Sequence, residues 1–228
     1  SIVLDLEASS EGFKKMIGLI TAGGEITSPK VFMEEYNKSD FRIAADSGVE
    51  FYLRNGVVPD RVLGDFDSIS KEGKSFIKEK KISVSSFPPE KDYTDLELCI
   101  DFLIEKGCKN IMILGGVGDR MDHSLANLFM MIRFYKAGIT ITLRNDLMKI
   151  QVLEGKLSLK KEYEFLSVVP ADPLGIVASL EGFYYPLDNR KIPLGSTLGV
   201  SNYIIEEEGH IDIAEGTAYI IQTNERKA

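Results

Sequence analysis

The chain has 228 residues, of which 44% are hydrophobic, so it can bury the core of one large domain or two smaller ones. Its formal net charge of −8 argues against a nucleic-acid backbone or an anionic membrane as the main partner. A phosphorylated small molecule is compatible with that charge, because a bound metal ion can reverse the local sign.

The two cysteines, Cys99 and Cys108, form neither a CxxC motif nor a zinc-like spacing. Cys99 lies on an apolar helical stripe, which favours a buried thiol and a reducing environment. No apolar run is long enough to span a bilayer, and residues 1–15 lack the apolar centre of a signal peptide. We therefore expect a cytoplasmic protein with no membrane or nucleic-acid partner.

Strands and helices alternate along the first two thirds of the chain. Short apolar runs bounded by turn residues predict strands at residues 16–21, 41–45, 61–63, 82–84, 110–114 and 139–143. Helices are predicted to begin near Ser28, at Ser47, Ser70 and Thr94, and after Gly118. This alternation is typical of a mostly parallel sheet covered on both faces, so we predict an α/β domain over residues 16–144.

After residue 146 the pattern changes to short β-rich segments separated by glycine and proline. The predicted strands lie at residues 157–159, 165–169, 176–180, 203–205, 211–213 and 219–222. No long helix is evident in this part of the sequence. We therefore predict a smaller all-β domain over residues 147–228, an antiparallel sandwich or partial barrel that packs directly on the first domain.

Acidic residues follow the ends of the predicted strands in the first domain. They are Asp46, Asp65, Asp67, Asp92, Asp95, Asp119 and Asp122. Because ligands of such sheets bind beyond the carboxyl ends of the strands, we expect these side chains to crowd one rim. Carboxylates at such a rim repel one another unless cations compensate them, which favours a metal–phosphate site.

The segment Gly64-Asp65-Phe66-Asp67-Ser68 carries two of these carboxylates one residue apart. Both can turn toward one point, and Mg²⁺ prefers such oxygen ligands, usually shared with substrate phosphates. The alternative is an acidic turn whose aspartates cap the next helix.

A glycine-rich turn over residues 115–118 joins a predicted strand to a helix, although neither GxxxxGK[ST] nor GxGxxG is present. Bare N–H groups at a helix start suit a phosphate, and Arg120 is placed to clamp a phosphate oxygen. The alternative is a tight turn with Asp122 as the N-cap. His123 is open to a role as a base or as a structural residue, whereas His210 lies in a predicted turn and receives no function.

The second domain contains a segment of glycine and hydroxyl residues, Gly195–Asn202, and an aromatic segment, Phe183–Leu187. Aromatic faces beside hydroxyl and amide groups suit a flat, polar heterocycle, including a cationic one. The alternative is an ordinary β-turn with aromatic residues of the core.

Five segments occur together in one order: residues 45–48, 59–68, 91–95, 118–127 and 195–202. On these segments the chain resembles the thiamine pyrophosphokinase family from about Met16 to near the C-terminus. The resemblance implies an N-terminal α/β domain, a C-terminal β domain, and a homodimer with thiamine bound near the dimer interface. It also implies Mg²⁺-dependent transfer of a pyrophosphoryl group from ATP to the thiamine hydroxyl, which yields thiamine diphosphate and AMP.

The resemblance also implies roles for individual residues. It implies that Asp65, Asp67 and Asp95 hold the metal ion. It also implies that these three residues and the nearby Asp92 are catalytic. It places Asp46, Thr94 and Arg120 around ATP, and Asp122, Tyr185, Ser201 and Asn202 around thiamine. Ser47 departs from the glycine usual in the family, and Tyr185 replaces a Trp of some relatives, which implies weaker stacking on the substrate.

Two other functions stay open from the residues alone. One is a different Mg²⁺ enzyme on the same scaffold, such as a phosphohydrolase or a kinase for a related heterocyclic alcohol. The other is a non-enzymatic sensor of thiamine or a nucleotide, although a sensor need not keep a complete set of acids.

Overall fold

The computed structural model describes residues 16–24, 28–86, 93–118 and 120–225. Its N-terminal part alternates strands and helices, as the sequence predicts. The elements are β1 (Ile17–Thr21), α1 (Pro29–Lys38), β2 (Phe41–Ala45), η1 (Asp46–Gly48), α2 (Val49–Asn55), β3 (Arg61–Gly64), α3 (Lys71–Glu79), β4 (Ser83–Ser86), α4 (Asp95–Glu105), β5 (Asn110–Leu114), α5 (Met121–Lys136) and β6 (Thr140–Arg144). The predicted features of residues 1–15 and 87–92 lie outside the described residues.

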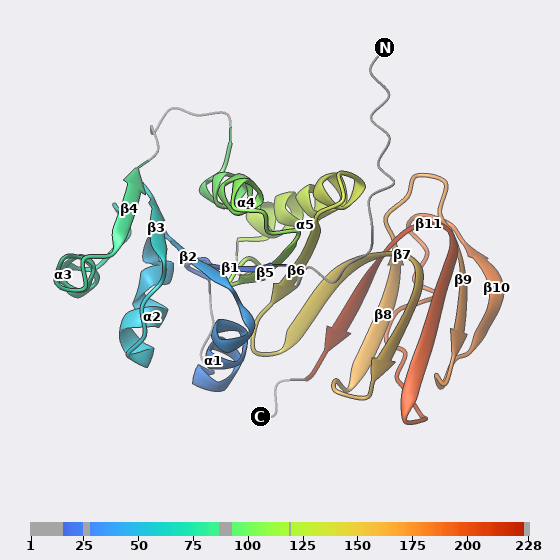
Figure 1. Cartoon of the computed structure of the whole chain (residues 1–228). Coiled ribbons are helices and arrows are strands. Elements are labelled where there is room, and N and C mark those ends of the chain that lie inside the picture. The colour runs from blue at the N-terminus through green and yellow to red at the C-terminus, as the bar shows by residue number, and fades with distance from the viewer. Residues whose placement is uncertain (1–15, 25–27, 87–92, 119, 226–228) are drawn as a thin grey trace, which may run out of the picture.

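The strands of this part form a parallel sheet in the order β6-β5-β1-β2-β3-β4. The chain moves outward from β1 to β4 and then returns to β5 on the other side of β1 (Figure 1). The loops that follow β1 and β5 therefore leave the sheet in different directions. Such a switch point opens a crevice at the carboxyl ends of the two strands, where ligands of open α/β sheets bind.

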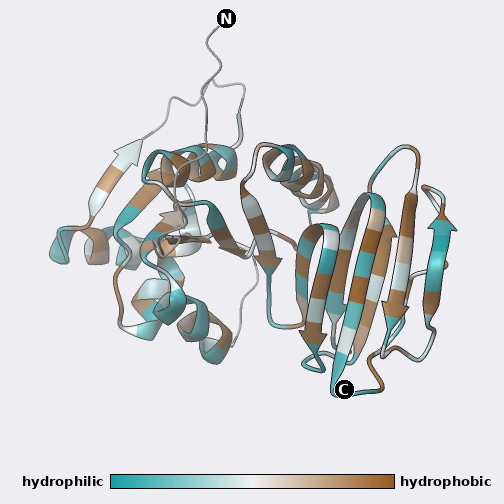
Figure 2. Cartoon of the chain, turned by 45° about the vertical axis from the view of Figure 1, so that its right-hand side comes forward, coloured by the Kyte–Doolittle hydropathy of each residue, from teal (hydrophilic) through white to brown (hydrophobic). Residues whose placement is uncertain are grey.

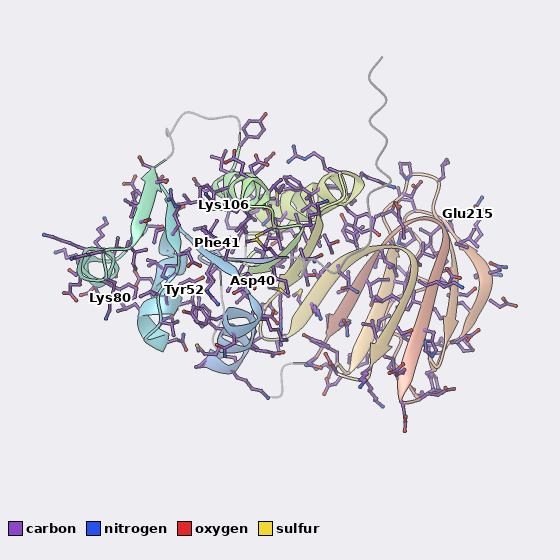
Figure 3. All side chains as sticks on the ribbon, in the orientation of Figure 1. Asp40, Phe41, Tyr52, Lys80, Lys106 and Glu215 are labelled. Carbon is purple, nitrogen blue, oxygen red and sulfur yellow. The ribbon has the colours of Figure 1, made fainter. Side chains whose placement is uncertain are left out.

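Helices cover both faces of the parallel sheet, with α4 and α5 on one face and α1 and α2 on the other (Figure 1). The predicted stripe of α4 is confirmed, because Cys99, Ile100 and Leu103 are fully buried against the sheet. On the opposite face Tyr52, labelled in Figure 3, meets Phe32 of α1 edge-on at a centroid distance of 5.1 Å. The two apolar layers hold the strand ends, and with them the rim, in fixed positions.

Three of the predicted helix starts are confirmed by their caps. The hydroxyls of Ser28, Ser70 and Thr94 accept hydrogen bonds from backbone N–H groups at distances of 3.3, 2.9 and 3.3 Å. The capping box predicted at Ser47 is wrong. Asp46 adopts a left-handed backbone and starts the 3₁₀ turn η1, so Ser47 lies inside that turn and α2 begins only at Val49.

The C-terminal part consists of antiparallel strands: β7 (Met148–Lys160), β8 (Phe165–Pro170), β9 (Ile176–Glu181), β10 (Leu187–Ile192) and β11 (Glu208–Thr223). The long strand β11 pairs with β7 on one side and with β9 and then β8 on the other. Hydrophobic and polar residues alternate along these strands, so one face builds a core while the other meets solvent (Figure 2). The predicted fold class, an α/β part followed by an antiparallel β part, is confirmed.

In this part a turn was predicted where a strand continues, one predicted strand is wrong, and one strand was not predicted. The segments predicted at residues 211–213 and 219–222 belong to one strand, β11, which is interrupted by an irregularity around Gly216 and not by a turn. The segment at residues 203–205 forms only an isolated bridge, from Ile204 to Phe183. Strand β10 was not predicted because its sequence, LDNRKI, is mostly polar and exposed, as an edge strand allows.

The two parts share one hydrogen-bonded sheet, because β6 pairs with β7 in antiparallel register from Thr142 to Arg144. Asn145 shapes the reversal between them, since its side-chain oxygen accepts from the backbone N–H groups of Leu147 and Met148 at 2.9 Å. The predicted division into domains at residues 144 and 147 falls on this reversal and stays a prediction. In the described part of the chain, no helix is both long enough and apolar enough to cross a membrane.

Candidate active site

A cavity of about 830 Å³ lies at the switch point between β1 and β5. Its lining includes Gly23 and Gly24 after β1, Gly115 and Gly116 after β5, Asp46 after β2, and Thr94 and Asp95 at the start of α4. The two glycine segments touch, because a Cβ on Gly24 would lie 2.2 Å from the carbonyl oxygen of Gly115. Glycine therefore lets the two backbones approach closely and line one side of the cavity with main chain.

Asp46 is held against the turn that follows β3. Its Oδ1 atom accepts a hydrogen bond from the N–H of Phe66 at 3.4 Å, and a Cβ on Gly64 would lie only 1.7 Å from that oxygen. Asp46 and Phe66 both have positive φ angles, of 46° and 65°. Residues other than glycine rarely adopt positive φ angles, and residues that do so are concentrated at functional sites.

Negative charge accumulates around Asp46. Burial, followed by the carboxylates of Asp95 and Asp65, raises the pKa of the Asp46 carboxyl above its ordinary value. The three acids come from the ends of β2 and β3 and from the start of α4, which the parallel sheet brings to one edge. The expected acidic rim is therefore present for these three residues.

Asp65 and Asp67 are exposed and lie beside the cavity, whose lining includes their neighbour Ser68. The backbone N–H of Asp67 donates to Oδ1 of Asp65 at 3.0 Å, so the loop holds the side chain of Asp65 against the backbone of Asp67. Among the described residues, no three His, Cys, Asp or Glu side chains come close enough together to hold a metal ion. Asp92 and Asp119 lie outside the described residues, so their predicted places at the rim stay predictions.

Arg120 and Asp122 both line the cavity and form an ion pair with each other. The Arg120 guanidinium donates from Nε and Nη2 to the two oxygens of Asp122, at 3.0 and 2.7 Å. This pairing holds the pKa of the Asp122 carboxyl well below its usual range, although both side chains are exposed. Asp122 lies inside the first turn of α5 and makes no N-cap hydrogen bond, so the alternative role as a cap is wrong.

The other polar residues weighed in the sequence are Thr94, His123 and His210, and only the first two line the cavity. Thr94 lines the cavity while its hydroxyl caps α4, so its capping role is confirmed and a contact with a ligand stays a prediction. His123 also lines the cavity and is exposed. His210 does not line the cavity, and the turn predicted for it is wrong. It lies within strand β11, where its Nδ1 is 2.8 Å from the hydroxyl oxygen of Ser158.

Two residues of α5 hold the glycine turn in shape, and sequence reasoning gave neither of them a role. The carboxamide of Asn127 donates to the carbonyl oxygen of Gly116 at 2.6 Å. The hydroxyl of Ser124 accepts from the N–H of Gly118 at 3.2 Å and lies at the same distance from its carbonyl oxygen. Their spacing of three residues, which places both on one helix face toward the turn, is the signal that could have identified them.

The residues predicted to bind thiamine from the C-terminal part, Tyr185, Ser201 and Asn202, do not line the cavity. Tyr185 is 58% exposed and contacts Tyr184 edge-on, which in turn stacks on Tyr203 at 4.7 Å. Ser201 is exposed in a left-handed turn.

Asn202, in contrast, is buried, and its side chain joins the two segments that carry these tyrosines. Its oxygen accepts from the N–H groups of Tyr185 and Tyr203, and its nitrogen donates to the carbonyl of Tyr185, all within 3.0 Å. In this structure Asn202 therefore orients the backbone of Tyr185, and its carboxamide oxygen accepts two hydrogen bonds from the protein itself.

Comparison with known proteins agrees with this arrangement. The family model for the catalytic domain of thiamin pyrophosphokinase matches residues 32–143, and the model for the vitamin B1 binding domain of the same family matches residues 154–217. The chain is 33% identical to thiamine pyrophosphokinase of Bacillus subtilis, over 80% of this chain and 87% of that protein. It is 26% identical to thiamin pyrophosphokinase 1 of Caenorhabditis elegans, over 82% of this chain and 81% of that one.

Solved structures give the same result. The crystal structure of the Bacillus subtilis enzyme superimposes with a TM-score of 0.81 at 30% identity, covering 92% of this chain and all of that one (100%). The structure from Geobacillus thermodenitrificans superimposes with a TM-score of 0.80 at 28% identity, covering 93% of this chain and 99% of that one. The chain therefore belongs to the thiamine pyrophosphokinase family of enzymes.

Proposed function

We propose that the chain catalyses the reaction of its family, the transfer of the pyrophosphoryl group of ATP to the hydroxyl of thiamine. The products are thiamine diphosphate and AMP. The observation that carries this proposal is the cavity at the β1–β5 switch point, which combines a glycine-lined wall with acids from three strand and helix ends. A phosphorylated substrate fits a wall of main-chain groups, and a cation fits a rim of carboxylates.

We propose Mg²⁺ as the cofactor of this site. Asp65, Asp67 and Asp95 would hold it, with Asp92 close by, and because the three described side chains do not converge in this structure they would have to move together around the ion. The donor set consists of carboxylate oxygens, which suit a hard cation. Burial and then the carboxylates of Asp95 and Asp65 raise the pKa of Asp46, so a cation near these acids would be favourable. When bound, the metal ion would neutralise charge on the phosphates that are transferred.

The contribution of the protein is mainly positioning and electrostatics, as in other phosphoryl transfers. Asp46, Thr94 and Arg120 are proposed to contact ATP, with Arg120 stabilising charge on the phosphates. In this structure the Arg120 guanidinium is paired with Asp122, so it must exchange at least part of that pairing for a phosphate. Asp122 then becomes available to thiamine, which carries a positive charge that a carboxylate attracts.

The chemistry is a direct in-line displacement. The thiamine hydroxyl oxygen forms a bond to the β-phosphorus, and the bond from that phosphorus to the oxygen bridging it to the α-phosphorus breaks. AMP leaves with the electron pair of the broken bond. The hydroxyl proton passes to a carboxylate, and Asp67 and Asp92 are both candidates for that role.

The test is the formation of AMP from ATP and Mg²⁺ with and without thiamine, with the second product identified by its mass. AMP and thiamine diphosphate that appear together, and only with thiamine, are the expected result. Orthophosphate released without thiamine would instead indicate a phosphohydrolase. Tight thiamine binding without AMP would indicate a sensor.

We further propose a homodimer in which the C-terminal part of one protomer completes the cavity of the other. Tyr185 and Ser201 are exposed and do not line the cavity of their own chain. Beside the cavity, α5 exposes an apolar row of Met121, Leu125 and Phe129, which are 67, 46 and 66% exposed and suit a partner surface.

Mixing two inactive variants tests this arrangement. Asp65→Asn damages the N-terminal site and Tyr185→Ala damages the C-terminal one, so a mixed dimer contains one intact composite site. After subunit exchange we expect about a quarter of wild-type activity to return, as the statistics of pairing in a C2 dimer require. No recovery, in spite of demonstrated exchange, would contradict the composite site.

A cytoplasmic location is also proposed, supported by the burial of both thiols.

A further inference from the structure

Asn127 occupies an unusual position among the residues that line the cavity. It lies on α5, facing the turn after β5, and only 9% of its surface is exposed. Its Nδ2 atom donates to the carbonyl oxygen of Gly116 at 2.6 Å. A buried polar side chain at the floor of a cavity is costly unless each of its polar atoms has a partner, in the protein or in a ligand.

The orientation of this carboxamide follows from its hydrogen bond. The Gly116 carbonyl can only accept, so the Asn127 side chain must turn its nitrogen toward it and its oxygen to the other side. Across the described part of the chain, no hydrogen bond reaches that oxygen, and it is not among the fully buried side-chain atoms that lack a partner. It therefore keeps access to the cavity as an unused acceptor.

The surroundings fix that acceptor in place. A Cβ on Gly116 would lie 2.9 Å from Ile113 and 3.0 Å from Leu143, so the turn rests on a packed apolar floor. One helical turn earlier, Ser124 holds the next part of the glycine segment through Gly118. The oxygen of Asn127 is thus preorganised, which makes a hydrogen bond to it selective.

The chemistry of an amide oxygen defines its ligand. It is a neutral acceptor, so it repels phosphate oxygens and binds N–H or O–H groups. Phosphates have a better partner at the rim, where the Arg120 guanidinium lies. The nucleoside half of ATP carries ribose hydroxyls and a purine amino group, and each of these can donate a hydrogen bond to the carboxamide oxygen of Asn127.

We propose that Asn127 is a specificity-determining residue whose carboxamide oxygen accepts a hydrogen bond from an N–H or O–H group of the nucleoside half of the donor nucleotide. The same side chain positions the glycine turn through its nitrogen. This inference rests on the proposed function for the identity of the nucleotide. Its test uses binding alone, so that a failure of turnover and a failure of this inference are distinguishable.

The experiment measures calorimetric affinities of the full chain for four nucleotides with Mg²⁺ and without thiamine. They are ATP, 2′-deoxy-ATP, 3′-deoxy-ATP and purine riboside triphosphate, each analogue lacking one donor group. We expect wild type to bind one analogue about three- to tenfold more weakly than ATP, the effect of one neutral hydrogen bond. In Asn127→Ala this difference disappears, because the acceptor is gone.

Two further variants separate the acceptor from the support of the turn. Asn127→Asp loses the hydrogen bond to Gly116 but keeps an acceptor oxygen, and Ser124→Ala loosens the turn while leaving Asn127 intact. Both are expected to bind all four nucleotides more weakly and to keep the difference between ATP and the critical analogue. Circular dichroism and thermal unfolding verify that each variant is folded.

Several outcomes would overturn the inference. Wild type that binds all four nucleotides within about twofold would leave no hydrogen bond to assign, and this measurement needs no variant. Equal discrimination in Asn127→Ala and wild type would place the donor on another residue. If Asn127→Ala instead lost the preference for thiamine over an analogue with a carbonyl in place of its amino group, the acceptor would serve thiamine and not the nucleotide.

Discussion

Charged residues gather in two regions of this molecule, and they are arranged in opposite ways. At the junction of the two parts, Arg144 at the end of β6 pairs with Glu34 at 3.0 Å and with Glu35, both on α1. Hydrogen bonds from Lys38 and then Arg144 lower the pKa of Glu34 to about 2. At the rim of the cavity, burial and then the carboxylates of Asp95 and Asp65 raise the pKa of Asp46.

The difference shows which charges serve the fold. The junction matches opposite charges around a side chain that is 14% exposed, so it ties α1 to the strand that leads into the C-terminal part. Asp146 adds to this tie, because its oxygens accept from the N–H of Ser28 at 3.1 Å. The rim carries like charges that destabilise the folded protein, and a site for a cation and phosphates accounts for keeping them.

The largest expected effect on stability lies at the junction. Arg144→Met keeps the length of the side chain but leaves Glu35, which is 6% exposed, as a buried carboxylate without its guanidinium partner. We expect the free energy of unfolding to fall by about 3 kcal/mol, measured by urea denaturation. The matched control is Lys156→Met, whose ammonium is 84% exposed and 3.8 Å from Asp212, and it should change stability by less than about 0.5 kcal/mol. Equal losses in the two variants would contradict the comparison.

The largest expected effect on turnover lies at the rim. Asp65→Asn removes a charged oxygen from an exposed loop, so stability should stay within about 0.5 kcal/mol of wild type. Turnover at limiting Mg²⁺ should fall on the order of a hundredfold, because the charge that would hold the metal ion is lost. Asp188→Asn, an exposed acid on β10, is the control and should leave AMP formation unchanged. Near-normal turnover of Asp65→Asn would remove this residue from the metal site.

A smaller effect of opposite sign is expected at Asp46. Because its pKa is raised in the folded state, the ionised carboxylate destabilises the protein at neutral pH, and Asp46→Asn removes that charge while keeping an acceptor for Phe66. Thermal unfolding should show a gain below about 1 kcal/mol, since water screens a half-buried carboxylate. The gain should vanish as the pH falls below 3.8, the ordinary pKa of this group, where wild type is protonated in both states. A variant less stable than wild type at neutral pH would show that the rim is not repulsive.

Sequence patterns predicted most of the α/β part because local signals there agree with the fold. The stripe of Cys99, Ile100 and Leu103 and the caps at Ser28, Ser70 and Thr94 act over three or four residues, and the structure contains all of them. The antiparallel part was predicted less well. The exposed edge strand β10 lacks an apolar pattern, and the irregularity near Gly216 lies within a strand that its partners hold together.

The sequence by itself determined the order of strands and helices, the acids at the strand ends and the family, because these depend on neighbours along the chain and on motifs in a fixed order. Tertiary structure alone decided that β6 and β7 join the two parts in one sheet and that Arg120 pairs with Asp122. It also decided that the side chain of Asn202 hydrogen-bonds to the backbone of Tyr185. The same holds for Asn127, whose side-chain nitrogen donates to Gly116 while its oxygen stays accessible from the cavity. These contacts depend on which surfaces pack together in the folded protein and on which hydrogen-bonding groups remain without a partner there. The spacing of residues along the chain predicts neither of these.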